Sequence, residues 1–353
     1  MEPILRDIAA ALGERLRGLG VTAEFVRRCT EPDPGLQLAL TCRREARFLD
    51  DPAVLAVRLL FCGEALTLEE TVAAFGELRP PALHTRIVAG LYIMSDYLGA
   101  GAAAEAVMGA GETTAVLWQA ARPSRRIGAT LDLGCGAGTL ALLLAGHAER
   151  VVGADINARA VEMSRFNAAL NGIGNVEFRC GDLYQPVEGE RFDLIVSQPP
   201  YYPGGELTFL HGGRRGDEIA RRVVDGVAGR LCVGGRALVL SSWPEDWWPL
   251  RVDGHNVIAL TADRCEVPGA EPGIVAIEPG SAGVSLRYRL SPECWGDAAS
   301  GDIDGLFAGR LPAVTRRFEE DGVRWEVRRL FGLATRVGGI VEAENCHGQD
   351  RDQ

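Results

Sequence analysis

Three turns of the sequence carry residue types suited to binding a nucleoside. The first is the glycine-rich run Gly134-Cys135-Gly136-Ala137-Gly138, and the two later turns contain Asp155 and Asp182. A glycine-rich turn lets the backbone approach a ligand closely, because glycine has no side chain. A carboxylate about 20 residues further on suits the hydroxyls of a ribose, and we expect the next carboxylate to accept the amine of an adenine. Ile156 and Leu183 would then sandwich the ring.

A second chemical pattern is Ser197-Gln198-Pro199-Pro200-Tyr201-Tyr202, which follows an apolar run. The amide oxygen of Gln198 and the carbonyl of Pro199 can accept hydrogen bonds from an amine or amide nitrogen and orient it for attack. The ring of Tyr201 can stack on a flat acceptor and stabilise positive charge that develops on it. The pattern therefore predicts chemistry at a planar nitrogen, and a rigid turn is the structural alternative.

A glycine-rich loop, His211-Gly212-Gly213-Arg214-Arg215-Gly216, follows this pattern. Its glycines let it fold over a crevice, where Arg214 or Arg215 could grip a carboxylate or phosphate of the substrate by a bidentate contact. His211 is a candidate base, although a histidine beside glycines is more often a surface residue. Four aromatic residues are candidates for the pocket wall, although such tryptophans are more often core residues: Tyr202, Trp243, Trp247 and Trp248.

The segments around these turns alternate between strand-like and helical patterns. Strand-like apolar runs occur at Ala129–Leu133, Val151–Ala154, Val176–Arg179, Phe192–Val196 and Arg236–Ser241. Helical patterns occur at Thr139–Gly146, Ala158–Asn171 and Asp217–Leu231. This alternation predicts right-handed βαβ units and a parallel sheet. Every turn described above follows a strand, so all of them should meet at the carboxyl edge of the sheet, where such folds bind ligands.

The remainder of the chain is predicted in less detail. Further strands are expected at Val257–Thr261, Ile274–Ile277, Ser285–Leu290 and Val337–Val341, and helices at Ile303–Arg310 or Ala313–Glu320. In the N-terminal part we expect helices at Ile4–Leu19, Val54–Cys62, Leu68–Phe75 and Pro81–Ala89, and a strand at Leu91–Leu98. The N-terminal pattern resembles a winged-helix module. We place a mainly helical cap domain at residues 1–106 and the sheet domain at residues 107–353.

The N-terminal module has few basic residues, and its third expected helix offers only His84 and Arg86. Binding to nucleic acid relies on basic side chains that neutralise phosphates. We therefore interpret the module as a lid, a substrate cap or the surface of a homodimer rather than as a DNA-binding element.

Three motifs in register resemble the class I S-adenosylmethionine-dependent methyltransferases, over roughly Gly109 to Ser242. The motifs are Leu131–Gly138, Val152–Asp155 and Gly181–Leu183. The resemblance implies a Rossmann-like, doubly wound, mostly parallel α/β sheet and S-adenosylmethionine as cofactor. A dinucleotide-binding oxidoreductase fits less well, because Leu140 stands where the third glycine of that fingerprint should be.

The resemblance also implies roles for individual residues. Four of them should lie beside the methionine part of the cofactor: Asp132, Gly134, Cys135 and Gly136. Asp155 would hold the ribose and Asp182 the adenine. The segment Glu112–Thr114 should approach the methionine end, which makes Thr113 a second-rank candidate for substrate contact.

The S-Q-P-P-Y-Y pattern resembles the (N/D)-P-P-(Y/F) signature of methyltransferases that act on planar nitrogens, either the base amines of DNA and RNA or the amide of glutamine. Gln198 departs from the signature, because it is one methylene longer than asparagine. A misplacement of about 1 Å can cost about 100-fold in rate. We therefore expect an acceptor different from those of the family.

Composition narrows the functional classes. The 353 residues carry 37 basic and 48 acidic side chains, with a formal net charge of -11, and every basic residue is arginine. The absence of lysine excludes pyridoxal Schiff-base, P-loop and kinase chemistry. The acidic surplus argues against nucleic acid as a partner. Nine cysteines without a C-x-x-C pair indicate a reducing cytoplasm and no metal site, and no apolar run reaches the roughly 18 residues of a membrane helix.

These observations together predict a cytoplasmic enzyme that methylates a nitrogen of a small molecule. An amino-acid-like or natural-product acceptor with an anionic group is the leading expectation, and it would place the enzyme in natural-product biosynthesis. The first alternative is N-methylation of a ribosomal RNA base or of a protein glutamine. The second is a non-catalytic protein that binds DNA or senses a metabolite.

Overall fold

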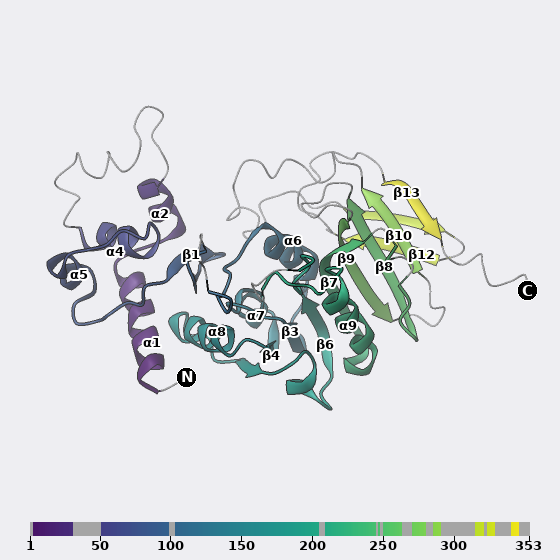
Figure 1. Cartoon of the computed structure of the whole chain (residues 1–353), viewed down its shortest axis with the longest axis horizontal. Coiled ribbons are helices and arrows are strands. Elements are labelled where there is room, and N and C mark those ends of the chain that lie inside the picture. Colours follow the sequence, from purple (N-terminus) through teal and green to yellow (C-terminus); the bar gives the residue numbers. More distant parts are fainter. Residues whose placement is uncertain are drawn as a thin grey trace, which may run out of the picture.

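The computed structural model describes residues 3–30, 51–98, 103–204, 209–244, 246–247, 250–262, 270–279, 285–290, 315–320, 323–328 and 340–345. Its centre is a nine-stranded sheet with the strand order β13-β10-β8-β9-β7-β6-β3-β4-β5 (Figure 1). Five neighbouring strands run parallel: β3 (Ile127–Leu133), β4 (Ala148–Asp155), β5 (Val176–Cys180), β6 (Phe192–Ser197) and β7 (Leu231–Pro244). The predicted parallel sheet is thereby confirmed.

The sheet continues beyond β7 with mixed directions. The additional strands are β8 (His255–Ala262), β9 (Ala270–Pro279), β10 (Ser285–Leu290) and β13 (Ile340–Asn345). Strand β9 lies antiparallel between β7 and β8, and β10 is parallel to β8. The strands expected around Val257, Ile274 and Ser285 are therefore confirmed, and the one expected at Val337–Val341 overlaps the start of β13.

Two hydrophobic cores cover the two faces of the sheet, as a doubly wound fold requires. On one face pack α6 (Glu112–Ala121), α7 (Thr139–Ala145) and α8 (Ala158–Leu170), and on the other pack α9 (Glu218–Val227) and two short 3₁₀ turns, η2 (Gln185–Val187) and η3 (Ala228–Arg230). Successive residues of a strand point to opposite faces. In β7, Leu238 belongs to the first core and Val239 to the second. Burial on both faces explains why these strands read as continuous apolar runs.

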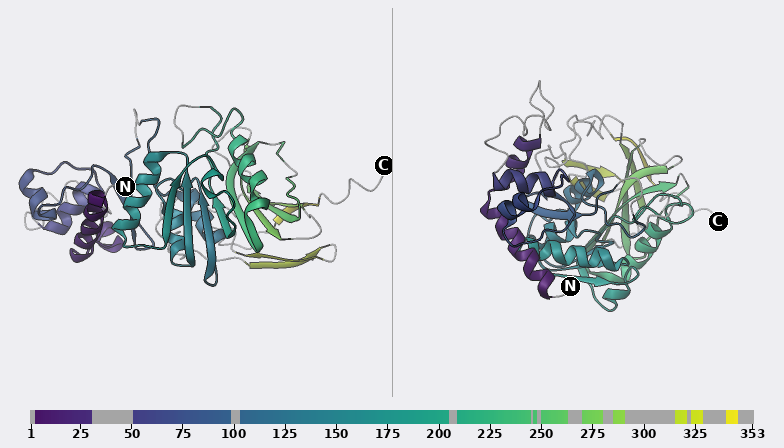
Figure 2. Two further views of the ribbon diagram at one scale, coloured as in Figure 1. Left: turned by 90° about the horizontal axis from the view of Figure 1, so that it is seen from below. Right: turned by 60° about the vertical axis from the view of Figure 1, so that its left-hand side comes forward.

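The N-terminal region contributes helices and a hairpin at one end of the molecule, opposite the C-terminal strands (Figures 1 and 2). Its elements are α1 (Pro3–Gly18), α2 (Ala23–Thr30), α4 (Pro52–Leu60), α5 (Leu68–Phe75), β1 (His84–Val88) and β2 (Leu91–Ser95). The capping box of Thr67 and Glu70 is present at the start of α5. The predicted helices at Ile4–Leu19, Val54–Cys62 and Leu68–Phe75 are therefore confirmed.

The helix expected at Pro81–Ala89 is wrong, because His84–Val88 within this range form the first strand of the hairpin. The turn consists of Ala89 and Gly90, whose φ angles are 49° and 86°. A tight two-residue hairpin turn needs positive φ at both positions. An alanine at the first position gives no indication of such a turn in the sequence. The DNA-binding alternative depended on a recognition helix at this place, so it loses that element.

Two asparagines join the hairpin to the sheet domain: the buried Asn167 of α8 and the half-buried Asn171 that caps the C-terminus of this helix. Asn167 accepts a hydrogen bond from the backbone N–H of Met94 and donates to the carbonyls of Met94 and Ala137, each at 2.9 Å. Asn171 exchanges two further bonds with the backbone of Tyr92. The hairpin is therefore bonded, through α8, to the glycine-rich turn that contains Ala137. The domain division between residues 106 and 107 stays a prediction.

The C-terminal part includes a second antiparallel pair, β11 (Thr315–Glu320) and β12 (Val323–Arg328). The helix predicted at Ala313–Glu320 is wrong, since most of that range is β11. The helix predicted at Ile303–Arg310 lies outside the described residues. Within the described ranges, no helix combines the length and the apolar character needed to cross a bilayer.

Candidate active site

A cavity of about 410 Å³ opens at the carboxyl ends of β3, β4, β5 and β6. Strand β3 lies between β4 and β6, so the strand order reverses at this point, and such reversal points are where open α/β sheets bind ligands. Eleven predicted site residues line the cavity: Asp132, Gly134, Cys135, Gly136, Asp155, Ile156, Asp182, Leu183, Gln198, Pro199 and His211. Thr114 lines it as well. The structure therefore brings the predicted cofactor residues together.

The glycine-rich turn presents bare backbone to this cavity. Gly134 has a φ of 78°, and a Cβ added there would meet no atom within 4 Å. Because Gly134 lines the cavity, such a Cβ would project into space that a ligand could use. Cys135 lines the same turn, but burial, reinforced by the nearby Asp155 and Asp132, raises the pKa of its thiol well above the ordinary value. Cys135 is therefore suited to packing and unsuited to nucleophilic chemistry.

Two carboxylates lie close behind this turn. Asp155 accepts hydrogen bonds from the backbone N–H groups of Gly136, at 2.8 Å, and Asn157, at 2.9 Å. Asp132 is 2% exposed and accepts from the N–H of Ala141 at 2.9 Å. Burial, with a smaller contribution from the charge of Asp155, raises the pKa of Asp132 to about 7. Burial also raises the pKa of Asp155. A cationic ligand beside them would stabilise both ionised forms.

The third turn combines a paired carboxylate with an unusual backbone conformation. Asp182 forms an ion pair with Arg222 of α9 at 2.5 Å, and both residues line the cavity. Leu183 has a φ of 47°, which non-glycine residues seldom adopt and which often marks functional turns. Ile156, facing the same cavity, leaves 66% of its side chain exposed. These features suit a flat ring held beside a carboxylate.

Gln198 follows β6 and is held by two residues from the start of α6. Its Nε2 donates to Thr113 Oγ1 at 2.6 Å, and its Oε1 accepts from Thr114 Oγ1 at 3.2 Å. Ser197 ties the end of β6 to β3 by donating to the carbonyl of Leu133 at 2.7 Å. Thr113 itself does not line the cavity, so its predicted substrate contact stays a prediction while its contact with Gln198 is observed.

The two tyrosines that follow the proline pair lie outside the lining of the cavity. The rings of Tyr201 and Tyr202 stack on each other, with centroids 5.3 Å apart. The backbone of Tyr202 pairs with the glycine-rich loop, donating to the carbonyl of Leu210 at 2.8 Å and accepting from the N–H of Gly212 at 2.9 Å. Stacking of Tyr201 on an acceptor stays a prediction.

Gly212 explains why this loop needs glycine. A Cβ at this position would lie 2.2 Å from the carbonyl oxygen of Gly216 and 2.4 Å from that of Pro200. Gly216 has a φ of 91°, and its Cβ would lie 2.5 Å from the carbonyl oxygen of Tyr201. The loop and the proline turn therefore touch backbone to backbone, which fixes the loop at the rim of the cavity.

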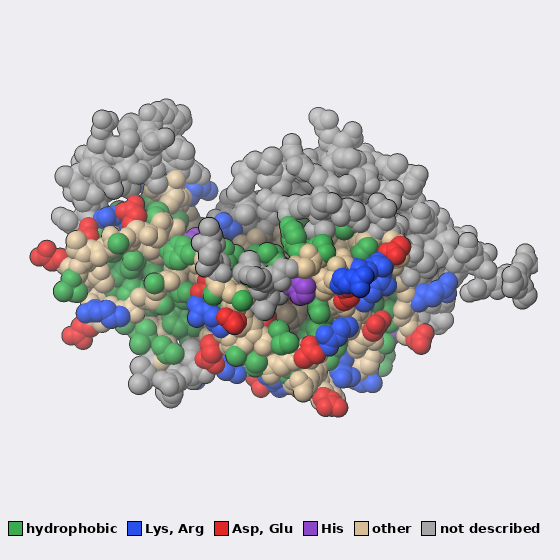
Figure 3. Space-filling model, in the orientation of Figure 1, with side chains coloured by type: hydrophobic (Ala, Val, Ile, Leu, Met, Phe, Trp, Pro, Cys, Tyr) green, Lys and Arg blue, Asp and Glu red, His purple; other side chains and the backbone are tan. Residues whose placement is uncertain are grey.

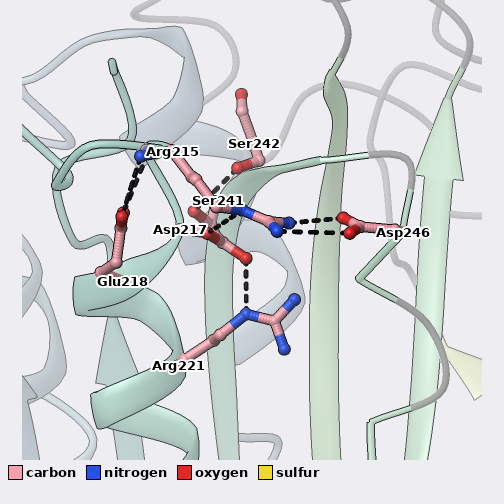
Figure 4. Close-up of polar contacts among 8 residues, drawn as sticks. Arg215, Asp217, Glu218, Arg221, Ser241, Ser242 and Asp246 are labelled. Carbon is pink, nitrogen blue, oxygen red and sulfur yellow. Dashed lines mark hydrogen bonds and ion pairs between the residues drawn. The ribbon is translucent and has the colours of Figure 1, made fainter. Parts of the chain in front are cut away.

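Arg215, one of the two arginines of the loop, lies in a network of carboxylates (Figure 4). The guanidinium of Arg215 forms an ion pair with Asp246 and lies 3.6 Å from the carboxylate of Asp217. Its backbone N–H donates to Glu218, and although burial raises the pKa of Glu218, hydrogen bonds from the loop backbone, led by that of Arg215, lower it overall. Arg214 is exposed. Arg215 therefore braces the loop. Contact of Arg214 with a substrate stays a prediction, since Arg214 does not line the cavity.

Asp217 is the buried centre of this network. Its side chain is 1% exposed and lies 2.5 Å from Nε of Arg221, one helical turn later. Figure 3 shows basic side chains gathered on this face, over α9. The described arginines of this stretch are Arg214, Arg215, Arg221 and Arg222, of which the last three are paired with carboxylates.

Several assignments need revision. Trp243 and Trp247 stack on each other at 4.8 Å and are 0% and 1% exposed, so they belong to the core and do not wall the cavity. Trp248 lies outside the described residues. Sequence reasoning missed Phe209 and Arg222, both of which line the cavity. Arg222 could not be predicted from the sequence, because only the folded chain places α9 beside Asp182 in the turn after β5. Phe209 could have been predicted, because it stands two residues before His211 at the start of the glycine-rich loop.

Comparison with known proteins identifies residues 109–241 as a match to the family described as "Methyltransferase small domain". A release factor glutamine methyltransferase from Aliivibrio fischeri is 44% identical over 88 residues, which cover 24% of this chain and 31% of that protein. A ribosomal RNA small subunit methyltransferase C from Cronobacter sakazakii is 35% identical over 117 residues, covering 33% of this chain and 31% of that protein.

A third relative is a putative protein N5-glutamine methyltransferase from Methanocaldococcus jannaschii, 36% identical over 121 residues, which cover 32% of this chain and 60% of that protein. The chain thus spans about a third to three fifths of the length of these curated relatives. All three are named for acting on a protein or on ribosomal RNA. The expectation of a small-molecule partner, and the argument against nucleic acid, are therefore wrong, and natural-product biosynthesis has no support. The net charge of -11 describes the whole chain and does not describe the surroundings of the cavity.

Proposed function

We propose that this protein transfers a methyl group to a planar nitrogen of a macromolecule. The reaction would be carried out by residues 109–241, the class I S-adenosylmethionine-dependent methyltransferase domain. The acceptor is a ribosomal RNA base or the side-chain amide of a protein glutamine, as the names of its relatives suggest. One observation carries the proposal. The Gln198-Pro199-Pro200 turn lines the same cavity as the glycine-rich turn and three carboxylates.

The residues around the cavity fit S-adenosylmethionine, the methyl donor of this family. The volume of about 410 Å³ lies within the roughly 300–1,000 Å³ typical of ligand pockets. The bare backbone of Gly134 allows close approach. We assign Asp132 to the methionine end, Asp155 to the ribose, and Asp182 to the adenine between Ile156 and Leu183. Bound in this way, the cofactor supplies an electrophilic methyl group on a positively charged sulfur.

The residues of the proline turn orient the acceptor. The side-chain amide oxygen of Gln198 and the backbone carbonyl oxygen of Pro199 accept hydrogen bonds from the N–H groups of a planar nitrogen. These bonds orient the acceptor so that the face of the nitrogen points at the methyl group. Proline has no N–H of its own, which leaves this part of the turn acceptor-rich. Tyr201 supplies a flat face for the acceptor, as the signature predicts. The loop around Gly212 closes the crevice and excludes water, and Arg214 meets an anionic group of the macromolecule.

A base amine and a glutamine amide share this chemistry, so experiment must distinguish them. The protein is incubated with methyl-labelled S-adenosylmethionine and, in separate arms, with unmodified ribosomal subunits, a peptide-release factor and a small-metabolite extract. We expect label in one macromolecular arm, and loss of that label in Gln198→Ala and Tyr201→Ala proteins that still bind the cofactor. Label confined to small metabolites would overturn the proposal. We also propose a cytoplasmic location, which the cysteine pattern supports.

A further inference from the structure

We infer that Thr113 and Thr114 are positioning residues that fix the amide of Gln198, so that a glutamine serves where related signatures have asparagine or aspartate. The inference rests on the proposed function, because it concerns how the same acceptor nitrogen is held. It extends that function by assigning two residues of α6 to the placement of a residue 84 and 85 positions later in the chain.

The contacts occupy both ends of the amide. Nε2 of Gln198 is 2.6 Å from Thr113 Oγ1, and Oε1 is 3.2 Å from Thr114 Oγ1. Both threonines belong to the first turn of α6, which begins at Glu112. Consecutive residues of a helix project about 100° apart. The amide therefore lies across the first turn of the helix and is fixed at two separate points.

The oxygen end of the amide faces Thr114. The backbone N–H of Gly111 points at Thr114 Oγ1 at 3.4 Å, so this hydroxyl has an acceptor role towards Gly111. Its single proton is then available for Gln198 Oε1. Thr113 Oγ1 accepts from Nε2 of Gln198. The amide oxygen thus lies on the side of Thr114, which lines the cavity, whereas Thr113 does not.

Anchoring matters because glutamine is more flexible than asparagine. Fixing a glutamine side chain costs about 1.5–2 kcal/mol of conformational entropy, and the threonines make that ordering independent of the acceptor. An amide oxygen has two lone pairs. With one directed at Thr114, the other remains for the N–H of the acceptor. Since a displacement of about 1 Å can cost about 100-fold in rate, loss of an anchor should affect methyl transfer more than folding.

The test replaces each threonine with valine, which keeps the shape and removes the hydroxyl. Thr113→Val is the sharper variant, because Thr113 does not line the cavity. We expect kcat/KM for methyl transfer to fall about 10- to 100-fold, with cofactor affinity unchanged. The matched control is Thr85→Val on β1, where the hydroxyl is buried and without a hydrogen-bond partner among the described residues.

A second variant separates anchoring from the signature itself. Gln198→Asn restores the residue type of the signature but shortens the side chain by one methylene, so that the amide loses its reach to the threonines. We expect its activity to fall at least about 10-fold. Activity equal to or above that of the unsubstituted protein would overturn the inference.

A third readout does not depend on activity. The side-chain amide resonances of Gln198, identified by their loss in Gln198→Ala, should shift in Thr113→Val and stay in place in Thr85→Val. If the unsubstituted protein methylates a macromolecule but Thr113→Val behaves like Thr85→Val, the inference fails and the proposed function stands. If no acceptor is methylated, the proposed function fails, and the resonances alone decide: a shift supports the anchoring, and no shift overturns it.

Discussion

The backbone N–H of Gly136 donates to Oδ2 of Asp155 at 2.8 Å. This bond joins the glycine-rich turn after β3 to the acidic turn after β4, so the two motifs form one structural unit. Oδ1 of the same carboxylate accepts from the N–H of Asn157 at 2.9 Å. A carboxylate has about four acceptor sites, which leaves capacity for two ribose hydroxyls. Asp155 therefore has a structural role in the turn, and we propose that it also holds the ribose.

Replacing Asp155 with alanine should weaken cofactor binding and destabilise the turn together. We expect S-adenosylmethionine affinity, measured by calorimetry, to fall at least about 10-fold, because each lost charge-assisted hydrogen bond is worth about 1.5–3 kcal/mol. Asp193→Ala is the matched control, since Asp193 also accepts a backbone bond, from Ala129 at 2.8 Å, but does not line the cavity. Equal cofactor affinity in the two variants would contradict the assignment.

Asp132 predicts a pH dependence of stability. Its pKa in the folded protein is raised to about 7, against 3.8 for a free carboxyl. The folded state therefore keeps a proton that the unfolded chain releases, and this group destabilises the ligand-free fold progressively as pH rises from about 4 to about 7. Fully developed, the effect is on the order of 4 kcal/mol.

The measurement compares Asp132→Asn with the unsubstituted protein in chemical unfolding at pH 5 and pH 8. Asparagine keeps an oxygen for the N–H of Ala141 and cannot ionise. We expect the variant to be the more stable at both pH values, by about 2 kcal/mol at pH 5 and by about 4 kcal/mol at pH 8. The same difference at both pH values would show that Asp132 does not titrate in this range.

Gly212→Ala should separate cofactor binding from methyl transfer. Its Cβ would overlap the carbonyl oxygens of Gly216 and Pro200, so the loop must move away from the proline turn. We expect methyl transfer to fall at least about 100-fold while cofactor affinity stays within about twofold. Gly229→Ala, where a Cβ meets no atom within 4 Å, should leave both quantities unchanged. Full activity of Gly212→Ala would mean that the loop does not position the acceptor.

The sequence predicted the strands well where burial is two-sided. The runs ending near Leu133, Asp155 and Ser197 are confirmed because a strand buried on both faces has to be continuously apolar. The hairpin turn at Ala89 could not be predicted, since alanine rarely adopts positive φ. The contact of Gln198 with Thr113 could not be predicted either, because no residue near position 198 indicates a partner at the start of a helix 85 residues earlier. The sequence pattern located the carboxylates Asp132, Asp155 and Asp182. Their hydrogen-bond and ion-pair partners became known only from the folded structure.

Asp217 and Asp246 should differ in their effect on stability, although both pair with an arginine of the same network. Asp217 is buried, and its loss leaves Nε of Arg221 without its carboxylate partner. We expect Asp217→Ala to lower the free energy of unfolding by about 1–3 kcal/mol. Asp246 is 70% exposed, and exposed pairs contribute little, so Asp246→Ala should have no measurable effect on urea denaturation. The reverse ranking would refute the view that Asp217 is the structural centre of the loop.

The central claim, methyl transfer to a planar nitrogen of a macromolecule, is tested most directly by locating the added methyl group. The labelled ribosomal RNA or release factor is digested, and mass spectrometry with fragmentation identifies the modified atom. We predict a methyl group on a base nitrogen or on the side-chain amide nitrogen of a glutamine, and its absence from the product of the Gln198→Ala protein. A methyl group on a ribose oxygen or on a carbon would contradict this account of the Gln198-Pro199-Pro200 turn.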